Sequence, residues 1–165
     1  MLLLALLGGI ATAQAIPQVP ANLQAALFAK MFKYDKKFEG RQDPIRVVVV
    51  HEALTDEVRA ITQAMTSVGM KVSQSTLAGL PAMMANTDVA YAMPEVSAEL
   101  VGKACLKSGS LSVSGVAGDA EKGWVSVALG VKGDGRPQII VNVTQAAREG
   151  HNFSSQLLAL AKIVR

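Results

Sequence analysis

The spacing of apolar residues predicts a helix followed by a buried strand. Asn22 can cap a helix whose apolar side chains recur at intervals of three and four residues: Leu23, Leu27, Met31, Tyr34 and Phe38. This spacing puts them on one face, which we expect to be buried. Residues 45–50 then form a nearly unbroken β-branched run, IRVVVV. Such a run is typical of a strand in the middle of a sheet.

Strands and helices alternate in the next part of the chain. Thr55 can cap a helix that Gly69 ends. The same reasoning predicts, in order, a strand over 70–75, a short helix over 80–85, a strand over 88–92, a helix over 95–107 and a strand over 111–116. This alternation favours a mostly parallel sheet with right-handed crossovers and helices on its faces.

The pattern changes after Gly118. Residues 124–129 and 138–143 are two apolar runs, and the segment 132–137 between them is rich in glycine. An antiparallel hairpin is therefore predicted near the C-terminus.

Two helices are predicted after the hairpin. We expect Thr144 to cap a short helix that Gly150 ends, and Ser154 to cap a last helix whose buried side extends to Val164. The complete pattern predicts one three-layer α/β domain. Its central sheet has about six strands, is mostly parallel with a C-terminal antiparallel hairpin, and carries helices on both faces.

The first fifteen residues have the pattern of a secretory signal peptide. An apolar run over residues 2–10 is followed by small residues that end in Ala13-Gln14-Ala15. We expect cleavage after Ala15, export of the chain and a folded domain over 16–165. No basic residue precedes the leucine run, although a signal peptide ordinarily begins with a positively charged region. The alternative is a buried N-terminal helix.

Length and charge narrow the class of protein. A chain of 165 residues with 50% apolar content suffices for one packed core and is short for two domains. Its 16 basic and 13 acidic residues are spread along the sequence and leave a formal charge of +3. Such a weak, dispersed charge argues against a nucleic-acid partner.

Motifs for catalysis are not found in the sequence. The glycine-rich stretches lack the features of a phosphate-binding loop, and neither G-x-S-x-G nor S-x-x-K occurs. His51, His151 and the single Cys105 have no metal-ligand spacing, and one cysteine excludes an internal disulfide. We expect no enzyme activity, cofactor or metal. An enzyme assembled from distant residues is the alternative.

Three residues are candidates for contact with a small ligand. His51 and Glu52 follow the first predicted strand, and Met93 follows the strand that ends at Ala92. Open α/β sheets bind ligands at the carboxyl ends of their strands. The alternative is that His51 and Glu52 are solvated loop residues.

Two groups of residues are candidates for contact with a protein partner. Lys30, Lys33, Lys36 and Lys37 lie along the first predicted helix and its end, where Asp35 is expected to offset part of their charge through local pairs. Met83 and Met84 lie in a short, weakly capped helix and are expected to form an exposed contact patch. A solvated helix face and core filling are the respective alternatives.

Two stretches of the chain resemble the YfiR-like family of periplasmic regulators. The first is LFAKMFKYD at 27–35, followed by two lysines and Phe38. The second is the closing order of PQIIVNV at 137–143, AAREG at 146–150 and NFSSQLLALA at 152–161. The resemblance covers both ends of the chain.

The resemblance implies a periplasmic α/β domain that restrains a membrane-bound signalling enzyme. The expected partner is a membrane-anchored protein such as a diguanylate cyclase or a histidine kinase. The oligomeric state is left open, with a homodimer as one option because symmetric dimers are common. With only Cys105, this chain cannot form the internal disulfides of some relatives. The alternative function is a soluble periplasmic protein that binds a small molecule.

Overall fold

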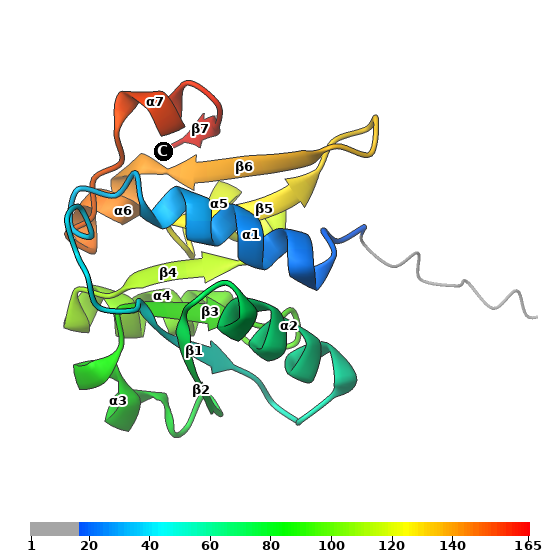
Figure 1. Ribbon diagram of the computed structural model, residues 1–165, viewed down its shortest axis with the longest axis vertical. Coiled ribbons are helices and arrows are strands. Elements are labelled where there is room, and N and C mark those ends of the chain that lie inside the picture. Colours follow the sequence, from blue (N-terminus) through cyan, green and yellow to red (C-terminus); the bar gives the residue numbers. More distant parts are fainter. Residues whose placement is uncertain (1–16) are drawn as a thin grey trace, which may run out of the picture.

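The β-branched run is the first strand along the chain, and it lies next to the edge strand of a seven-stranded sheet. This strand is β1, Arg46–Val50, and its four valines are buried. The computed structural model describes residues 17–165, so the predicted signal peptide at 1–15 lies outside the described residues. The strands follow the order β2-β1-β3-β4-β5-β6-β7 across the sheet (Figure 1).

Five neighbouring strands make the parallel part of the sheet. All pairs from β2 across to β5 are parallel, as predicted from the alternation of strands and helices. Their burial confirms that the sheet is covered on both sides, because every residue of β3 and β4 is buried. Besides β1, these strands are β2, Lys71–Ser75; β3, Val89–Ala92; β4, Leu111–Ser114; and β5, Val127–Val131.

The predicted antiparallel hairpin is confirmed. Strand β5 pairs in antiparallel register with β6, Pro137–Asn142, so that Val127 lies opposite Val141 and Gly130 opposite Gln138. Gly135 has a φ of +82° in the connecting turn, a conformation that glycine adopts without strain.

The prediction of one long last helix is wrong. The helix α7 covers only Ser155–Leu158, and Lys162–Val164 forms a seventh strand, β7, parallel to β6. A three-residue strand is too short to show a two-residue period. Pairing with the free edge of β6 therefore decides the structure of these residues.

Helices cover both faces of the sheet (Figure 1). Helices α1, Ala21–Phe32, and α2, Asp56–Ser67, lie on one face and pack against each other. Helices α4, Ala98–Ser108, and α5, Ala117–Glu121, lie on the other face. Three short elements complete the structure: α3, Leu80–Met83; the 3₁₀ helix η1, Met84–Asn86; and α6, Val143–Arg148.

Of the four predicted helix caps, Thr55 and Ser154 occupy the expected positions, whereas Asn22 and Thr144 do not. Thr55 accepts a hydrogen bond from the Val58 amide, as expected. Asn22 lies inside α1, which begins after Pro20, and Thr144 lies inside α6, which Asn142 caps through the Gln145 amide. Ser154 occupies the cap position of α7, but its buried hydroxyl has no hydrogen-bond partner among the described residues.

Helix α4 packs closely against the backbone at Trp124. A Cβ atom at Gly102 would lie 1.9 Å from the Trp124 carbonyl oxygen, so only glycine fits there. Among residues 17–165, no helix combines the length and the apolar character needed to cross a membrane.

Candidate functional site

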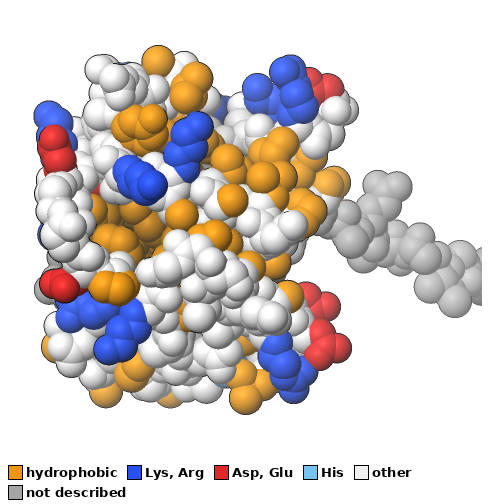
Figure 2. Space-filling view, viewed as in Figure 1, with side chains coloured by type: hydrophobic (Ala, Val, Ile, Leu, Met, Phe, Trp, Pro, Cys, Tyr) orange, Lys and Arg blue, Asp and Glu red, His pale blue; other side chains and the backbone are white. Residues whose placement is uncertain are grey.

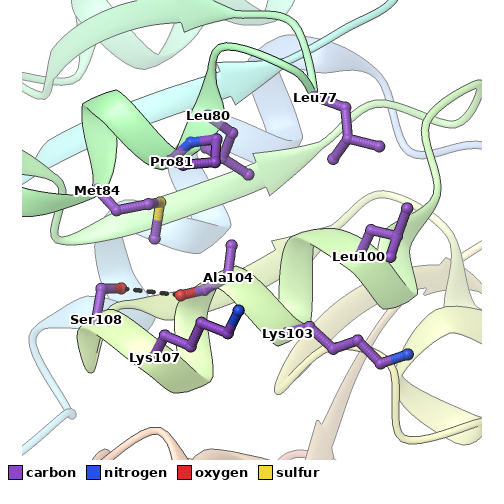
Figure 3. Close-up of a pocket in the computed structure, with 9 residues that line it drawn as sticks. All are labelled: Leu77, Leu80, Pro81, Met84, Leu100, Lys103, Ala104, Lys107 and Ser108. Atoms are coloured by element: carbon purple, nitrogen blue, oxygen red, sulfur yellow. Dashed lines mark hydrogen bonds between the residues drawn. The ribbon is translucent and has the colours of Figure 1, made fainter.

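A groove of about 470 Å³ lies between the segment that carries α3 and η1 and the outer face of α4 (Figure 3). Its first wall is apolar and consists of Leu77, Leu80, Pro81 and Met84. Leu80 and Met84 are buried, with exposed fractions of 1% and 7%, so they lie at the bottom of the groove.

The second wall of the groove is one stripe of α4. Leu100, Lys103, Ala104 and Lys107 follow the three- and four-residue spacing of a helix face, and Ser108 ends the stripe. The opposite face of α4 packs into the core. This arrangement leaves Leu100 47% exposed, although it is a large apolar side chain.

The groove is basic along its α4 rim. Lys103 forms an ion pair of 2.7 Å with Glu99, one turn earlier on the same helix. Lys107 forms no ion pair with any residue in the described part of the chain. The groove therefore combines an apolar interior with a lysine that lacks a partner.

Met84 also lines a second cavity, next to the segment that follows α1. This cavity of about 300 Å³ is lined by Lys37 and Arg46 as well, and it shares Ser108 with the groove. The structure thus brings two of the residues predicted to contact a partner, Lys37 and Met84, to one surface.

The methionine pair does not form the exposed contact patch that we predicted. Met84 is buried in the floor of the groove, and Met83 is half-buried beside a different cavity, next to Arg46 and Lys71. The two side chains point apart because neighbouring residues on a helical turn do not share a face.

The predicted ligand residues lie at the carboxyl edge of the sheet. His51 follows β1 and Met93 follows β3, and these strands are neighbours. The Met93 amide donates a hydrogen bond to the Val50 carbonyl, next to His51. The chain runs from β1 to β2 on one side and then crosses to β3 on the other, so this edge is a topological switch point.

His51 is unusual at this edge because its ring is buried without satisfying its polar atoms. The residue is 7% exposed, and its Nδ1 has no hydrogen-bond partner among the described residues. Glu52, by contrast, is exposed. The prediction that His51 is a solvated loop residue is therefore wrong, and an unpaired buried nitrogen is the kind of atom that a ligand or water can satisfy.

The lysines of the first helix and of the segment that follows it have different environments. Lys30 lies on α1, whereas Lys33, Lys36 and Lys37 follow the end of this helix, and all four are exposed. Of these, the Lys37 ammonium donates a hydrogen bond to the Gly109 carbonyl oxygen. On the face that carries α1, basic side chains occur at separate places and form no continuous stripe (Figure 2).

Comparison with known proteins decides the family. The sequence profile of the YfiR/HmsC-like family matches residues 21–162. The chain belongs to the YfiR/HmsC-like family. This membership agrees with the resemblance seen in the sequence, and it suggests a periplasmic regulator of cyclic di-GMP signalling. No curated protein matches the sequence significantly.

Solved structures show the same type of fold. An ABC domain from Streptococcus pneumoniae in complex with L-Trp is similar with a TM-score of 0.66 and 11% identity over 88% of this chain. Ureidoglycine-glyoxylate aminotransferase from Bacillus subtilis gives a TM-score of 0.52 and 12% identity over 81%. The YfiR/HmsC-like chain matches 60% and 40% of these two chains, respectively. At such identities the likeness concerns the fold alone.

A buried polar pair joins the two ends of the YfiR/HmsC-like domain and was missed in the sequence. Asp35 was expected to pair with nearby lysines, but its side chain is fully buried against His151, with 2.5 Å between Oδ2 and Nδ1. The other ring nitrogen of His151 lies 3.1 Å from the Gly109 carbonyl oxygen. Both ring nitrogens of His151 therefore lie within hydrogen-bond distance of an oxygen atom.

A second buried network surrounds Glu149. Its carboxylate accepts hydrogen bonds from the Ser112 amide and hydroxyl, the Ser126 hydroxyl and the Gln145 side chain, at 2.5–2.9 Å. Burial raises the pKa of Glu149, and the hydrogen bonds from these donors partly oppose the rise. The serines within apolar strands were the only sign of this network in the sequence.

These buried groups are engaged in contacts within the domain. Glu149 uses its oxygens for four hydrogen bonds, and burial raises the pKa of the Cys105 thiol well above its ordinary value. Such a thiol is a poor nucleophile. Within residues 17–165, no three His, Cys, Asp or Glu side chains come together in a way that suits a metal ion.

Proposed function

We propose that this protein is a non-enzymatic periplasmic regulator that restrains a membrane-bound signalling enzyme through protein–protein contact. A diguanylate cyclase, which makes cyclic di-GMP, is the leading partner, and a histidine kinase is the other partner type. In this proposal residues 1–15 direct export and are removed by cleavage after Ala15.

The observation that carries this proposal is the family match over residues 21–162. The structure adds a surface suited to contact, where Lys37 and Met84 line one cavity. Lys30, in the last turn of α1, and Lys33, directly after this helix, are exposed and available to an acidic partner surface.

Deletion of the gene tests the proposal. If the protein restrains a cyclase, its loss raises cellular cyclic di-GMP, and a plasmid copy restores the original level. A plasmid copy with Lys30→Glu and Lys33→Glu should restore it less well, because the altered charges repel an acidic partner. Unchanged cyclic di-GMP and unchanged envelope signalling after deletion would contradict the proposal.

A second function, binding of a small molecule, is favoured by the unpaired Nδ1 of buried His51. The proposed site includes His51, Glu52 and Met93 at the carboxyl edge of β1 and β3. A thermal-shift screen with metabolites tests it, because a ligand at 100 times its dissociation constant stabilises the fold by about 2.7 kcal/mol. A hit must lose its effect in His51→Phe. The absence of any shift would contradict the small-molecule function, and regulation would be the one function still proposed.

A further inference from the structure

We propose that the groove between α3 and α4 binds an amphiphilic carboxylate, such as a fatty acid of medium chain length. The site is separate from the His51 edge and from Lys30 and Lys33, and it shares Met84 with the cavity that Lys37 lines. The inference is independent of the proposed regulatory function, because it rests on the shape, apolar lining and charge of the groove.

The apolar lining suits an acyl chain. Leu77, Leu80 and Met84 project from one wall toward Leu100 and Ala104 on the other (Figure 3). Leu100 remains 47% exposed in the absence of a ligand, and covering such a side chain removes apolar surface from water. An acyl chain gains the same benefit when it lies between these walls.

The length of the groove limits the size of the chain. It follows α4 from Leu100 to Lys107, which corresponds to roughly 10 Å at about 1.5 Å per helical residue. Its volume of about 470 Å³ falls within the range of sites for small molecules. A standard protein interface uses about 20–30 residues on each side, and the groove has nine.

The charge of the rim selects the head group. Lys107 lies at the end of α4 without an ion-pair partner in the described chain, while Lys103 is already paired with Glu99. The negative end of the α4 dipole opposes a carboxylate at this position. The charge of Lys107 must therefore outweigh the dipole, so Lys107 is the residue that distinguishes an anionic from a cationic amphiphile.

Titration of the purified protein with two matched amphiphiles tests the proposal. Decanoate and decyltrimethylammonium share an apolar chain and differ in the sign of the head group. Binding is followed by calorimetry and by NMR shifts of the Leu100 and Ala104 amides, at concentrations at which both compounds are monomeric. We expect decanoate to bind at least tenfold more tightly than decyltrimethylammonium.

Two variants with matched controls locate the site. Lys107→Gln should weaken decanoate binding several-fold and remove the preference for the anion, and Leu100→Ser should weaken both compounds. The controls are Lys132→Gln in the hairpin turn and Leu160→Ser, which removes another exposed leucine; both should bind as the unchanged protein does. Absence of binding, equal binding of the two compounds, or NMR shifts confined to other regions would overturn the proposal.

Discussion

Asp35 and His151 form a fully buried pair across 116 positions of the chain, with Oδ2 and Nδ1 2.5 Å apart. The pair sits beside a backbone bridge between Asp35 and Phe153, and the Lys36 amide donates to the Asn152 carbonyl. The segment after α1 is therefore attached to the segment before α7. This attachment explains why α1 ends at Phe32 instead of continuing to Phe38.

Removal of either partner should destabilise the domain strongly. We expect Asp35→Ala or His151→Ala to lower the free energy of unfolding by about 3–5 kcal/mol, because each removes one member of the pair and leaves the other buried without it. Urea denaturation measures the effect. Glu99→Gln, which breaks the exposed pair with Lys103, is the control and should change little. Equal effects of the buried and exposed changes would refute this role.

Glu149 should make stability depend on pH in a defined direction. Burial raises its pKa in the folded state above the ordinary value of 4.5, so the folded protein holds the proton more tightly than the unfolded chain does. The corresponding stabilisation is complete below pH 4.5 and is lost as the pH rises through the raised value. Glu149→Gln lacks this loss, so it should gain stability relative to the unchanged protein as the pH rises from 4.5 to 7.

The comparison for Glu149 requires denaturation curves of both proteins at several pH values. Glu52→Gln is the matched control, since Glu52 is exposed. A difference between Glu149→Gln and the unchanged protein that stays constant with pH would show that burial does not shift this carboxyl group.

Gly102 should tolerate no side chain, although it lies inside a helix. Alanine favours helices by about 1 kcal/mol over glycine, but its Cβ would collide with the Trp124 carbonyl oxygen. We expect Gly102→Ala to lower the free energy of unfolding by about 1–3 kcal/mol. Gly118→Ala in α5 meets open space and should be neutral or stabilising. Thermal melts of both variants compare them directly, and a stabilised Gly102→Ala would show that α4 can shift.

The sequence was sufficient to predict most of the fold. The valine run at β1 and the alternating strands and helices gave the parallel sheet, and the glycine-rich turn gave the β5–β6 hairpin. Strand β7 was missed because three residues carry too little periodic signal. Its position is determined by pairing with β6, whose residues lie about twenty positions earlier in the sequence, so no local pattern reports it.

The candidate sites were predicted less completely. His51 and Met93 could be placed together because strand ends meet at one edge of a parallel sheet. The groove depends on how α3 approaches α4, which local spacing does not specify. Asp35, His151 and Glu149 are single polar residues whose partners lie far away in sequence or on other elements. Only the folded chain brings these groups together.

Export provides the most direct test of a periplasmic regulator. A strain that lacks the gene would express residues 16–165 either behind a known cleavable secretory leader or without a leader, and cellular cyclic di-GMP would be measured by mass spectrometry. We predict that deletion raises cyclic di-GMP and that only the exported form returns it to the original level. Equal restoration by the form without a leader, or no change in any strain, would contradict the account.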